Sequence, residues 1–490
     1  MPVKDLTTAA VDLYLALLAV VVLLADLFLP ARLRKEKVII TVAGLLLGLV
    51  PVATLWRLDP ASEFSGAYLL DGFALFFKVL FLVGGALVAV LSYDYLRNLA
   101  RGFGSYLFLL VVVILGCSLL ASANDLIVVY IAFEMISLSS YILAGYLRFD
   151  RRSNEAGLKY FLFGAAASAV MLYGFSWLYG LGQSTNMTEI SQNLALGLQS
   201  GSGLLAFSPA GVAALVLILV GLGYKIAMAP FQAWVPDVYE GAPTPVTAFL
   251  SIAPKAAGFA FLLRLLGPVG TYLMPMWPEV LAVFAVLTMF AGNLMALPQT
   301  NIKRMLAYSS VAHAGYLLIG VVVYTRGGFN LSALLYYLVA YLVMNLGAFA
   351  VATLVERNTG RQMISDYAGL ARGEPLVAAL MTLFLLSLIG IPPTAGFVGK
   401  LLIFGAALRT PPWGWLAIVG IINAVISVYY YMNIVREMYF GRGRERQLPV
   451  RPASVMIIIV LLAIAVLVLG LIPNLVMPAA GDMARFLWSG

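Results

Sequence analysis

Long apolar runs separated by short polar connections recur along the chain from one end to the other. A helix needs about 20 mostly apolar residues to cross roughly 30 Å of hydrocarbon, and about fourteen runs meet that requirement. These predicted spans are centred near residues 20, 47, 80, 114, 136, 168, 221, 255, 288, 313, 342, 391, 425 and 465. The longest polar stretch, residues 183–202, is too short to fold alone and is expected to be a loop between spans. The pattern predicts an all-α polytopic membrane protein.

Composition and charge agree with this fold class, because 62% of the residues are hydrophobic and only 11% are charged. The net charge of +8 would suggest nucleic acid as a partner in a soluble protein. Of the thirty Lys and Arg residues, however, twenty fall in connections after odd-numbered predicted spans and six fall on the other side. The positive-inside rule then predicts that odd connections are cytoplasmic and that both termini are non-cytoplasmic. No nucleic acid is needed to explain the charge.

Two further patterns limit the chemistry. The first apolar run contains Asp12 and Asp26 and lacks a small-residue cleavage site, so we expect a first span and no removable signal peptide. One cysteine, Cys117, and one histidine, His313, are too few to hold an iron–sulfur cluster or a bis-histidine haem within the chain. Dinucleotide, phosphate-loop and nucleophile-elbow motifs are also missing from the sequence. We therefore expect no cofactor and no metal in this chain.

The remaining four basic residues, all lysines, lie inside predicted spans: Lys78, Lys225, Lys255 and Lys400. An ionisable group at the bilayer centre costs at least ~2.5 to 3.5 kcal/mol, so each lysine needs a partner or a purpose. Glu134, near the middle of the fifth predicted span, is a natural partner. Burial disfavours the charged form of each group while pairing favours both, so Glu and Lys at matched depth can exchange protonation states. The pattern predicts a proton switch, and the alternative is a static ion pair.

Prolines interrupt two of the lysine-bearing spans. Lys225 precedes Pro230 in YKIAMAPFQAW. Lys400 follows Pro392 and Pro393 in SLIGIPPTAGFVGK. A proline lacks the backbone donor, and such a break at membrane depth is tolerated where it lines a polar path or is covered by protein. Broken spans in corresponding places of two halves are typical of an ion pathway in an inverted-repeat transporter.

The two broken spans are the seventh and the twelfth, five apart, which predicts two inverted repeats of five helices. The corresponding division of the chain gives N-terminal helices 1 to 3 at residues 1–103 and a first repeat, helices 4 to 8, at 104–270. A second repeat, helices 9 to 13, follows at 271–440, and a C-terminal helix 14 at 441–490.

The other polar groups inside spans leave alternatives open. Lys255, in AFLSIAPKAAGFAF, follows another proline among small residues, which suits either a proton relay or a packed lysine bonded to carbonyls. His313, in YSSVAHAGYLLIG, titrates near neutral pH in water and has hydroxyl neighbours, which suits either a proton chain or a packed polar group. Lys78 lies seven residues after Asp71 on the same helical face and either functions in transfer or extends toward an interface.

The residues around these charges resemble subunit N of bacterial respiratory complex I, an antiporter-like family related to mitochondrial subunit 2 and its chloroplast counterpart. The motifs that carry the resemblance are FEMISLSSYILAGY (133–146), RRSNEAGLKYFLFGAAASAVMLYGFSWLYG (151–180), GLGYKIAMAPFQAWVPDVYEGAPTPVTAFLSIAPK (221–255), QTNIKRMLAYSSVAHAGY (299–316), DYAGL (366–370) and GIPPTAGFVGK (390–400). Together they cover most of the chain.

The resemblance implies two inverted five-helix repeats, each with a half-channel and a broken helix, joined by a central hydrophilic axis. By motif position, Glu134 and Lys225 take the place of the family's first-channel pair. Lys255 takes the place of the central lysine and Lys400 that of the second broken-helix lysine, with His313 in the motif between them. Nothing is implied for Lys78.

The resemblance also implies a function: a proton-translocating subunit of NADH:quinone oxidoreductase in the bacterial inner (plasma) membrane. Quinone, NADH, FMN and iron–sulfur clusters are then expected in other subunits, and the partners are neighbouring antiporter-like subunits and lipid. One alternative is a subunit of a multisubunit cation/proton antiporter without a redox partner. Another is a passive scaffold whose charges only specify helix packing. The wording of DYAGL and EMISLSSYILAGY favours the complex I subunit.

Overall fold

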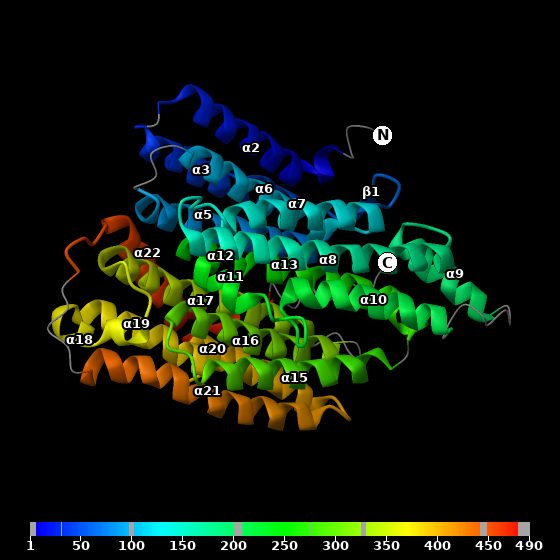
Figure 1. Cartoon of the computed structure of the whole chain (residues 1–490). Helices are drawn as coiled ribbons and strands as arrows, with labels where there is room; N and C mark the ends of the chain where they lie inside the picture. The colour runs from blue at the N-terminus through cyan, green and yellow to red at the C-terminus, as the bar shows by residue number, and fades with distance from the viewer. Residues whose placement is uncertain are drawn as a thin grey trace.

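The computed structural model of this chain describes residues 6–30, 32–97, 102–199, 208–274, 276–324, 330–441 and 448–478. Its long helices lie side by side in one bundle (Figure 1). In chain order the spans are α2 (Ala10–Phe28), α3 and α4 (Arg34–Leu47, Leu49–Leu55), α5 (Gly72–Tyr95), α6 (Phe103–Ser122), α7 (Leu126–Ala144), α8 (Arg151–Gly182), α10 and α11 (Pro209–Ile226, Val235–Gly241), α12 and α13 (Thr244–Leu250, Ala253–Leu265), α15 (Trp277–Ala296), α16 (Ile302–Tyr324), α17 (Asn330–Thr359), α19 and α20 (Pro375–Ile389, Ala395–Arg409), α21 (Gly414–Phe440) and α22 (Ala453–Leu471).

Thirteen helices among the described residues are long and apolar enough to cross a membrane. The twelfth predicted span is not one of them, because it is divided into α19 and α20. With that divided span included, the prediction of about fourteen transmembrane helices is confirmed. Short elements connect the spans: β1 (Ala61–Glu63), β2 (Tyr68–Leu70), α9 (Met187–Gln199), η1 (Leu266–Gly270), α14 (Thr271–Leu273), η2 (Ile364–Tyr367), α18 (Leu370–Gly373) and η3 (Pro473–Leu475).

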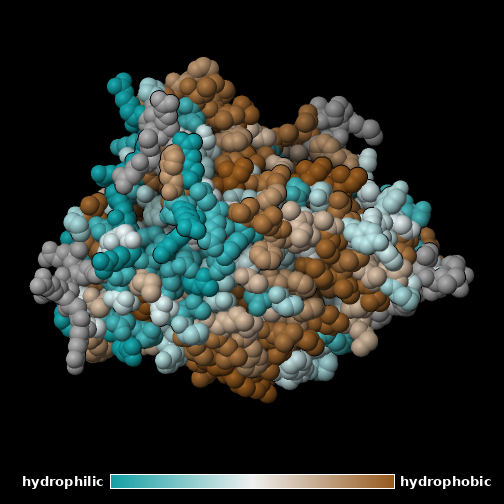
Figure 2. All heavy atoms as spheres, in the orientation of Figure 1, coloured by the Kyte–Doolittle hydropathy of each residue, from teal (hydrophilic) through white to brown (hydrophobic). Residues whose placement is uncertain are grey.

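Side-chain burial separates an inner layer of spans from an outer one. The eighth span is 100% buried over its most apolar window, and the tenth and eleventh are 94% buried. The first, sixth, thirteenth and fourteenth are only 33 to 39% buried. Their outward side chains are apolar, and Figure 2 shows hydrophobic residues over broad areas of one face, with hydrophilic residues gathered toward one end. The outer helices therefore present an apolar surface to their surroundings, and the eighth, tenth and eleventh spans form the protein-lined centre.

Connections after odd-numbered spans meet at one end of the bundle, here called the odd end. There Arg357 Nη1 lies 3.2 Å from Asp94 Oδ1, and Ser454 Oγ donates to Asp94 over 3.0 Å. Connections after even-numbered spans meet at the other end, the even end, where Tyr68 pairs with Ala123 and Asp125 with Asn186. Successive spans therefore run in opposite directions.

Two spans are broken where the sequence places prolines, which confirms the two predicted broken helices. The helix α10 ends at Ile226, Ala227 takes a left-handed conformation with φ of 62°, and α11 begins at Val235. The helix α19 ends at Ile389, Gly390 has φ of 94°, and α20 begins at Ala395. A third interruption, between α12 and α13, divides the eighth span.

One connection differs from the expectation. The polar stretch 183–202 was expected to be a loop, but within its described part α9 forms a helix of 13 residues. Met187, Ile190 and Leu194 are fully buried on one face of it. This spacing of three and four residues is typical of an amphipathic helix, and the apolar residues are too sparse for hydropathy to reveal it. Both chain ends and the charges Arg326, Arg442, Arg444, Arg446 and Arg485, which contributed to the predicted orientation, lie outside the described residues.

Candidate functional site

The first break, between α10 and α11, is held by hydrogen bonds that replace those of a continuous helix. The Met228 N–H donates to Gly223 O over 2.7 Å. The Ala229 N–H donates to Thr288 Oγ1 of α15 over 3.0 Å, and the Trp234 indole N–H donates to Tyr224 O over 3.1 Å. Pro230 lies within this break and has no N–H to satisfy. The backbone groups freed by the break thus find partners within the protein.

Lys225 lies at the end of α10, directly before the break. Its ammonium donates to Ser137 Oγ of α7 and, over 3.0 Å, to Ser168 Oγ of α8. Glu134 of α7 lies one helical turn from Ser137, and its Oε1 is 4.0 Å from Lys225 Nζ. No hydrogen-bond donor among the described residues contacts Glu134 Oε1. The expected pair is therefore present at the outer limit of ionic contact, with a carboxylate oxygen that is not otherwise engaged.

The second break, between α19 and α20, satisfies its backbone with a lysine. Lys400 of α20 extends back across the break, and its ammonium donates to Leu388 O over 2.9 Å and to Ile389 O over 2.8 Å. The Gly396 N–H donates to Ser387 Oγ over 3.1 Å. Pro392 and Pro393 lie in the turn between the two helices. Within the described residues, no carboxylate forms an ion pair with Lys400.

Lys255 lies near the start of α13, just after the third interruption. Its ammonium donates to Ser310 Oγ over 2.7 Å and to Ser310 O over 3.2 Å. The same ammonium lies 5.7 Å from the centre of the Tyr239 ring. Lys255 is 4% exposed and takes part in no ion pair of the described residues. Its contacts combine a hydroxyl, which can pass a proton, with a carbonyl, which cannot.

His313 lies in the middle of α16 and bonds to tyrosines from two other spans. Its Nδ1 is 2.6 Å from the Tyr337 hydroxyl of α17, and its Nε2 is 3.3 Å from the Tyr431 hydroxyl of α21. The Tyr431 hydroxyl also bonds to Ser309 Oγ. Ser309 precedes the serine that binds Lys255. The tenth span thus brings Lys255 and His313 onto neighbouring hydroxyl groups in the buried centre of the bundle.

Tyr316 extends this central group toward the second break. The Lys400 ammonium lies 4.8 Å from the centre of the Tyr316 ring, and that ring is 5.6 Å from the His313 ring. Lys255, His313 and Lys400 are therefore linked through one helix, α16, and the aromatic residues around it. Glu134 and Lys225 form a separate pair in the first half.

Lys78 is buried and does not extend toward an interface, so that alternative is wrong. Its ammonium binds both carboxylate oxygens of Asp12 over 2.9 and 2.8 Å, and it also donates to Ser118 Oγ over 2.9 Å. Asp71, seven residues before it, pairs instead with Arg264 over 2.8 Å. The partner comes from the first span, which the spacing of residues around Lys78 could not reveal.

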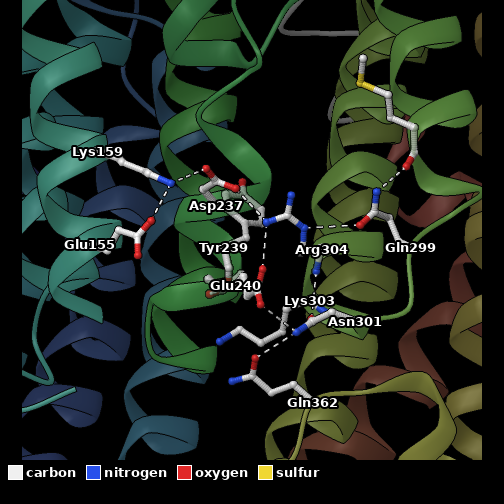
Figure 3. A network of polar contacts seen from close by, with 12 residues as sticks. Glu155, Lys159, Asp237, Tyr239, Glu240, Gln299, Asn301, Lys303, Arg304 and Gln362 are labelled. Atoms are coloured by element: carbon white, nitrogen blue, oxygen red, sulfur yellow. Dashed lines mark hydrogen bonds and ion pairs between the residues drawn. The ribbon is translucent and has the colours of Figure 1, made fainter. Parts of the chain in front are cut away.

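A network at the odd end joins α8, α11 and α16, and sequence analysis did not identify it (Figure 3). Lys159 Nζ lies 2.7 Å from both Glu155 Oε1 and Asp237 Oδ2. Arg304 lies 2.7 Å from the other oxygen of Asp237 and 2.8 Å from Glu240. A cavity of about 190 Å³ lies among these groups. The Glu155 and Lys159 spacing of four residues was the available signal, since such pairs are neighbours on a helix.

The network also changes the interpretation of Lys303, which the sequence pattern assigned to the charges of a connection. Lys303 is 1% exposed, and its ammonium donates to Ala242 O over 2.7 Å. Neither this region nor any other described part of the chain has three or more His, Cys, Asp or Glu side chains placed to hold a metal ion. The single cysteine, Cys117, is a buried free thiol.

Known proteins with similar sequences and folds identify the family. Residues 123–427 match the family described as "NADH:quinone oxidoreductase/Mrp antiporter, TM". The chain is 42% identical over 454 residues to NADH-quinone oxidoreductase subunit N of Chlorobium chlorochromatii (strain CaD3), covering 90% of this chain and 86% of that protein. It is also 42% identical over 471 residues to the same subunit of Moorella thermoacetica (strain ATCC 39073 / JCM 9320), with 96% of each covered.

Solved structures give the same result for the fold. A chain of respiratory complex I from Thermus thermophilus with bound aureothin superposes with a TM-score of 0.80 at 34% identity, covering 96% of this chain and 99% of that one. A chain of the Mrp complex from Dietzia sp. DQ12-45-1b gives a TM-score of 0.84 at 21% identity, with 99% and 98% covered, which concerns the fold alone. This chain therefore belongs to the NADH:quinone oxidoreductase/Mrp antiporter membrane family, on the branch of subunit N.

Proposed function

We propose that this chain is the proton-translocating, antiporter-like membrane subunit of a respiratory NADH:quinone oxidoreductase. Quinone reduction in neighbouring subunits drives proton transfer through it. The observation that carries the proposal is the Lys225 ammonium at the first helix break, 4.0 Å from a carboxylate, Glu134, whose nearer oxygen has no hydrogen-bond donor among the described residues. Relatives that are 42% identical over most of the chain are named as that subunit.

In this proposal Glu134 controls whether Lys225 holds its proton. When the carboxylate approaches, it stabilises the ammonium, and when it withdraws, the buried lysine releases its proton because an unpaired charge is costly there. The hydroxyls of Ser137 and Ser168, which already bind the ammonium, are the first acceptors in reach. The residues flanking Pro230 permit small movements, because the break leaves α10 and α11 joined by a turn.

The proposed route continues along the tenth span. Lys255 exchanges protons with Ser310, His313 connects the Tyr431 and Tyr337 hydroxyls, and Lys400 acts at the second break. Moving a proton against the membrane potential costs ~2.3 kcal/mol per charge per 100 mV. The groups that carry the proton must therefore be driven between states that differ in free energy by several kcal/mol. The drive comes from outside this chain, whose sequence offers one cysteine and one histidine for redox ligands.

The assembly and orientation follow from the same proposal. Neighbouring antiporter-like subunits and lipid cover the apolar outer helices, and NADH, FMN, iron–sulfur clusters and quinone are bound by other subunits. The excess of Lys and Arg in odd connections supports a cytoplasmic odd end and both termini on the non-cytoplasmic side of a bacterial inner membrane. We retain 104–270 and 271–440 as the two inverted repeats, each containing one of the two breaks.

The competing function is a cation/proton antiporter subunit without a redox partner, which the Mrp-like fold supports. The two functions differ in what drives transport, because an antiporter needs a cation gradient and no NADH. The sequence identity favours the first: 34% with a complex I chain and 21% with the Mrp chain.

The proposal is tested by proton pumping per NADH oxidised in vesicles that contain the purified complex, for the Lys225→Ala variant. A positioned proton-transfer group typically contributes roughly 10²- to 10⁴-fold to the rate, so we expect proton transfer through this subunit to fall at least roughly tenfold. Native gels establish that the complex assembles, and NADH oxidation with a soluble electron acceptor establishes that the redox subunits work. Normal pumping by the assembled variant would assign Lys225 a purely structural role.

A further inference from the structure

Three hydroxyl residues of the eighth span, here called the hydroxyl ladder, precede Lys255 in the sequence. Thr244, Thr247 and Ser251 are followed by Lys255 at spacings of three, four and four residues. Thr244 and Thr247 share one face of α12, where such residues are neighbours. Ser251 caps the end of α12, and Lys255 follows across the interruption in α13. All three hydroxyl residues are completely buried, in the most enclosed span of the bundle. In the structure the Thr247 hydroxyl donates to Tyr239 O over 3.0 Å and the Ser251 hydroxyl donates to Ala248 O over 2.7 Å.

The outer end of the ladder contacts a carboxylate. Thr244 Oγ1 donates a hydrogen bond to Glu356 Oε2, which belongs to α17. The other oxygen, Oε1, accepts from the Tyr95 hydroxyl over 3.0 Å and from Gln362 Nε2 over 2.6 Å. None of these three partners is charged, so Glu356 is held in place without a direct ion pair among the described residues.

Glu356 lines a cavity of about 500 Å³ at the odd end. The cavity is large enough for many water molecules, and its polar lining includes Asp94, Tyr95, Arg97 and Arg357. Two of the other charged lining residues, Arg357 and Asp94, are paired with each other over 3.2 Å, and the third is Arg97. Glu356 is therefore the carboxylate that joins this cavity to the buried ladder.

We propose that Glu356 is the proton-uptake group of this subunit and that the hydroxyl ladder of the eighth span conducts protons from it to Lys255. This inference rests on the proposed function and adds to it the place where protons enter. The proposal also assigns a role in proton conduction to the interruption between α12 and α13. Ser251, at the interruption, accepts a hydrogen bond from Asn345 over 2.6 Å, so a polar amide of α17 lies beside the ladder halfway to Lys255.

The transfer conserves atoms and charge. A hydronium ion in the cavity gives one proton to the Glu356 carboxylate and becomes water. The resulting carboxylic acid donates a proton to the Thr244 hydroxyl while this hydroxyl passes its own proton onward. Transfer between successive hydroxyls requires Thr247 and Ser251 to rotate away from the carbonyls that they now bind. The last acceptor is the neutral amine that remains after Lys255 has given its proton to the Ser310 side. Lys255 becomes an ammonium again, Glu356 returns to the carboxylate, and no electrons are transferred.

The first test compares Glu356→Gln with Glu374→Gln in the purified complex, reconstituted into vesicles. Both carboxylates lie at the odd end and bind neighbouring loops, but Glu374 pairs with Arg451 and lies outside the ladder. General acid–base groups typically contribute 10²- to 10⁴-fold, so we expect proton pumping per NADH to fall at least roughly tenfold for Glu356→Gln. Glu374→Gln should pump normally. Glu356→Asp should restore part of the pumping, because it keeps the ionisable group.

A second pair of variants distinguishes a role in proton conduction from a role in helix packing. Thr247 and Thr353 are both buried, and each hydroxyl bonds to a backbone carbonyl. Thr247→Val should reduce pumping with assembly unchanged, whereas Thr353→Val should leave both intact. If Glu356→Gln and Thr247→Val pump as well as their controls while Lys225→Ala does not pump, proton entry at Glu356 is overturned and the proposed function survives. If Lys225→Ala also pumps normally, the proposed function itself fails.

Discussion

The two broken helices use their lysines in opposite ways. At the first break a tryptophan satisfies the freed backbone, since the Trp234 indole donates to Tyr224 O, and Lys225 is left to face Glu134 and two serine hydroxyls. At the second break Lys400 itself satisfies the backbone by binding the carbonyls of Leu388 and Ile389. This difference explains why Lys225 precedes its break and Lys400 follows its own.

A lysine beside a helix break is therefore not by itself a proton carrier. A carbonyl can hold an ammonium but cannot take its proton, whereas a hydroxyl can pass a proton and a nearby carboxylate can shift the equilibrium. By this criterion the contacts at the first break support the proposed control of protonation, and those at the second break do not. At the second break the Lys400 ammonium binds the carbonyls of Leu388 and Ile389, and neither of these groups can accept its proton.

The largest structural effect is expected for Lys400→Met, which keeps the length of the side chain and removes its donors. Leaving a buried acceptor unsatisfied costs about 1 to 3 kcal/mol, so local opening around the second break should become at least roughly tenfold more frequent. Hydrogen exchange of the peptide covering residues 386–400, measured by mass spectrometry on the intact complex, reports this opening. Lys159→Met, which affects only ion pairs at the odd end, is the control. Unchanged exchange around the break would show that Lys400 does not hold it together.

A smaller effect is expected for Trp234→Phe at the first break. The substitution removes the indole donor to Tyr224 O but keeps an aromatic ring stacked at 4.5 Å on Tyr160. A typical hydrogen bond contributes about 0.5 to 1.5 kcal/mol, so exchange across residues 221–234 should rise by up to roughly tenfold. Trp413→Phe is a matched control, because the Trp413 indole N–H has no hydrogen-bond partner among the described residues. Equal increases in hydrogen exchange for the two variants would show that the Trp234 indole does not stabilise the first break.

The smallest effect is expected for Asp237→Asn in the odd-end network, which ties α11 to α8 and α16 (Figure 3). Its partners are partly exposed, and exposed ion pairs contribute about 0.2 to 1 kcal/mol each and weaken with salt. Hydrogen exchange of the backbone amides of α11 should rise only a few-fold at low salt, and no rise should be measurable at high salt. Glu437→Gln, whose ion pair with Arg436 is on the surface, provides the control. A large effect that salt does not reduce would mean that the network positions the first break directly.

The number of spans and the position of the two proline breaks could be predicted from the sequence, because both depend on local signals. Hydropathy over about 20 residues identifies a span, and a proline identifies the missing donor. The pairing of Glu134 with Lys225 was also predictable, since only one span carried a carboxylate near its centre.

Contacts that join distant spans could not be predicted in the same way. Asp12 binds Lys78 across 66 residues of sequence, and the serine that binds Lys255 is 55 residues away. The backbone carbonyls that hold Lys400 carry no sequence signal at all, because every residue has one. Lys303 looked like a connection charge, although its ammonium is held by Ala242 O from another connection. Side-chain partners of this kind depend on how helices pack, which no local pattern records.

The most direct test of the switch at the first break is a double-mutant cycle on proton pumping per NADH, with Glu134→Gln and Lys225→Ala singly and together. We expect a coupling of roughly 0.5 to 3 kcal/mol between them, as for groups in contact. The effects of Glu134→Gln and Lys400→Ala on pumping per NADH should be additive in the double variant, because Lys400 is held by carbonyls at the other break. Additive effects for Glu134 and Lys225 would contradict the claim that the carboxylate controls the protonation of this lysine.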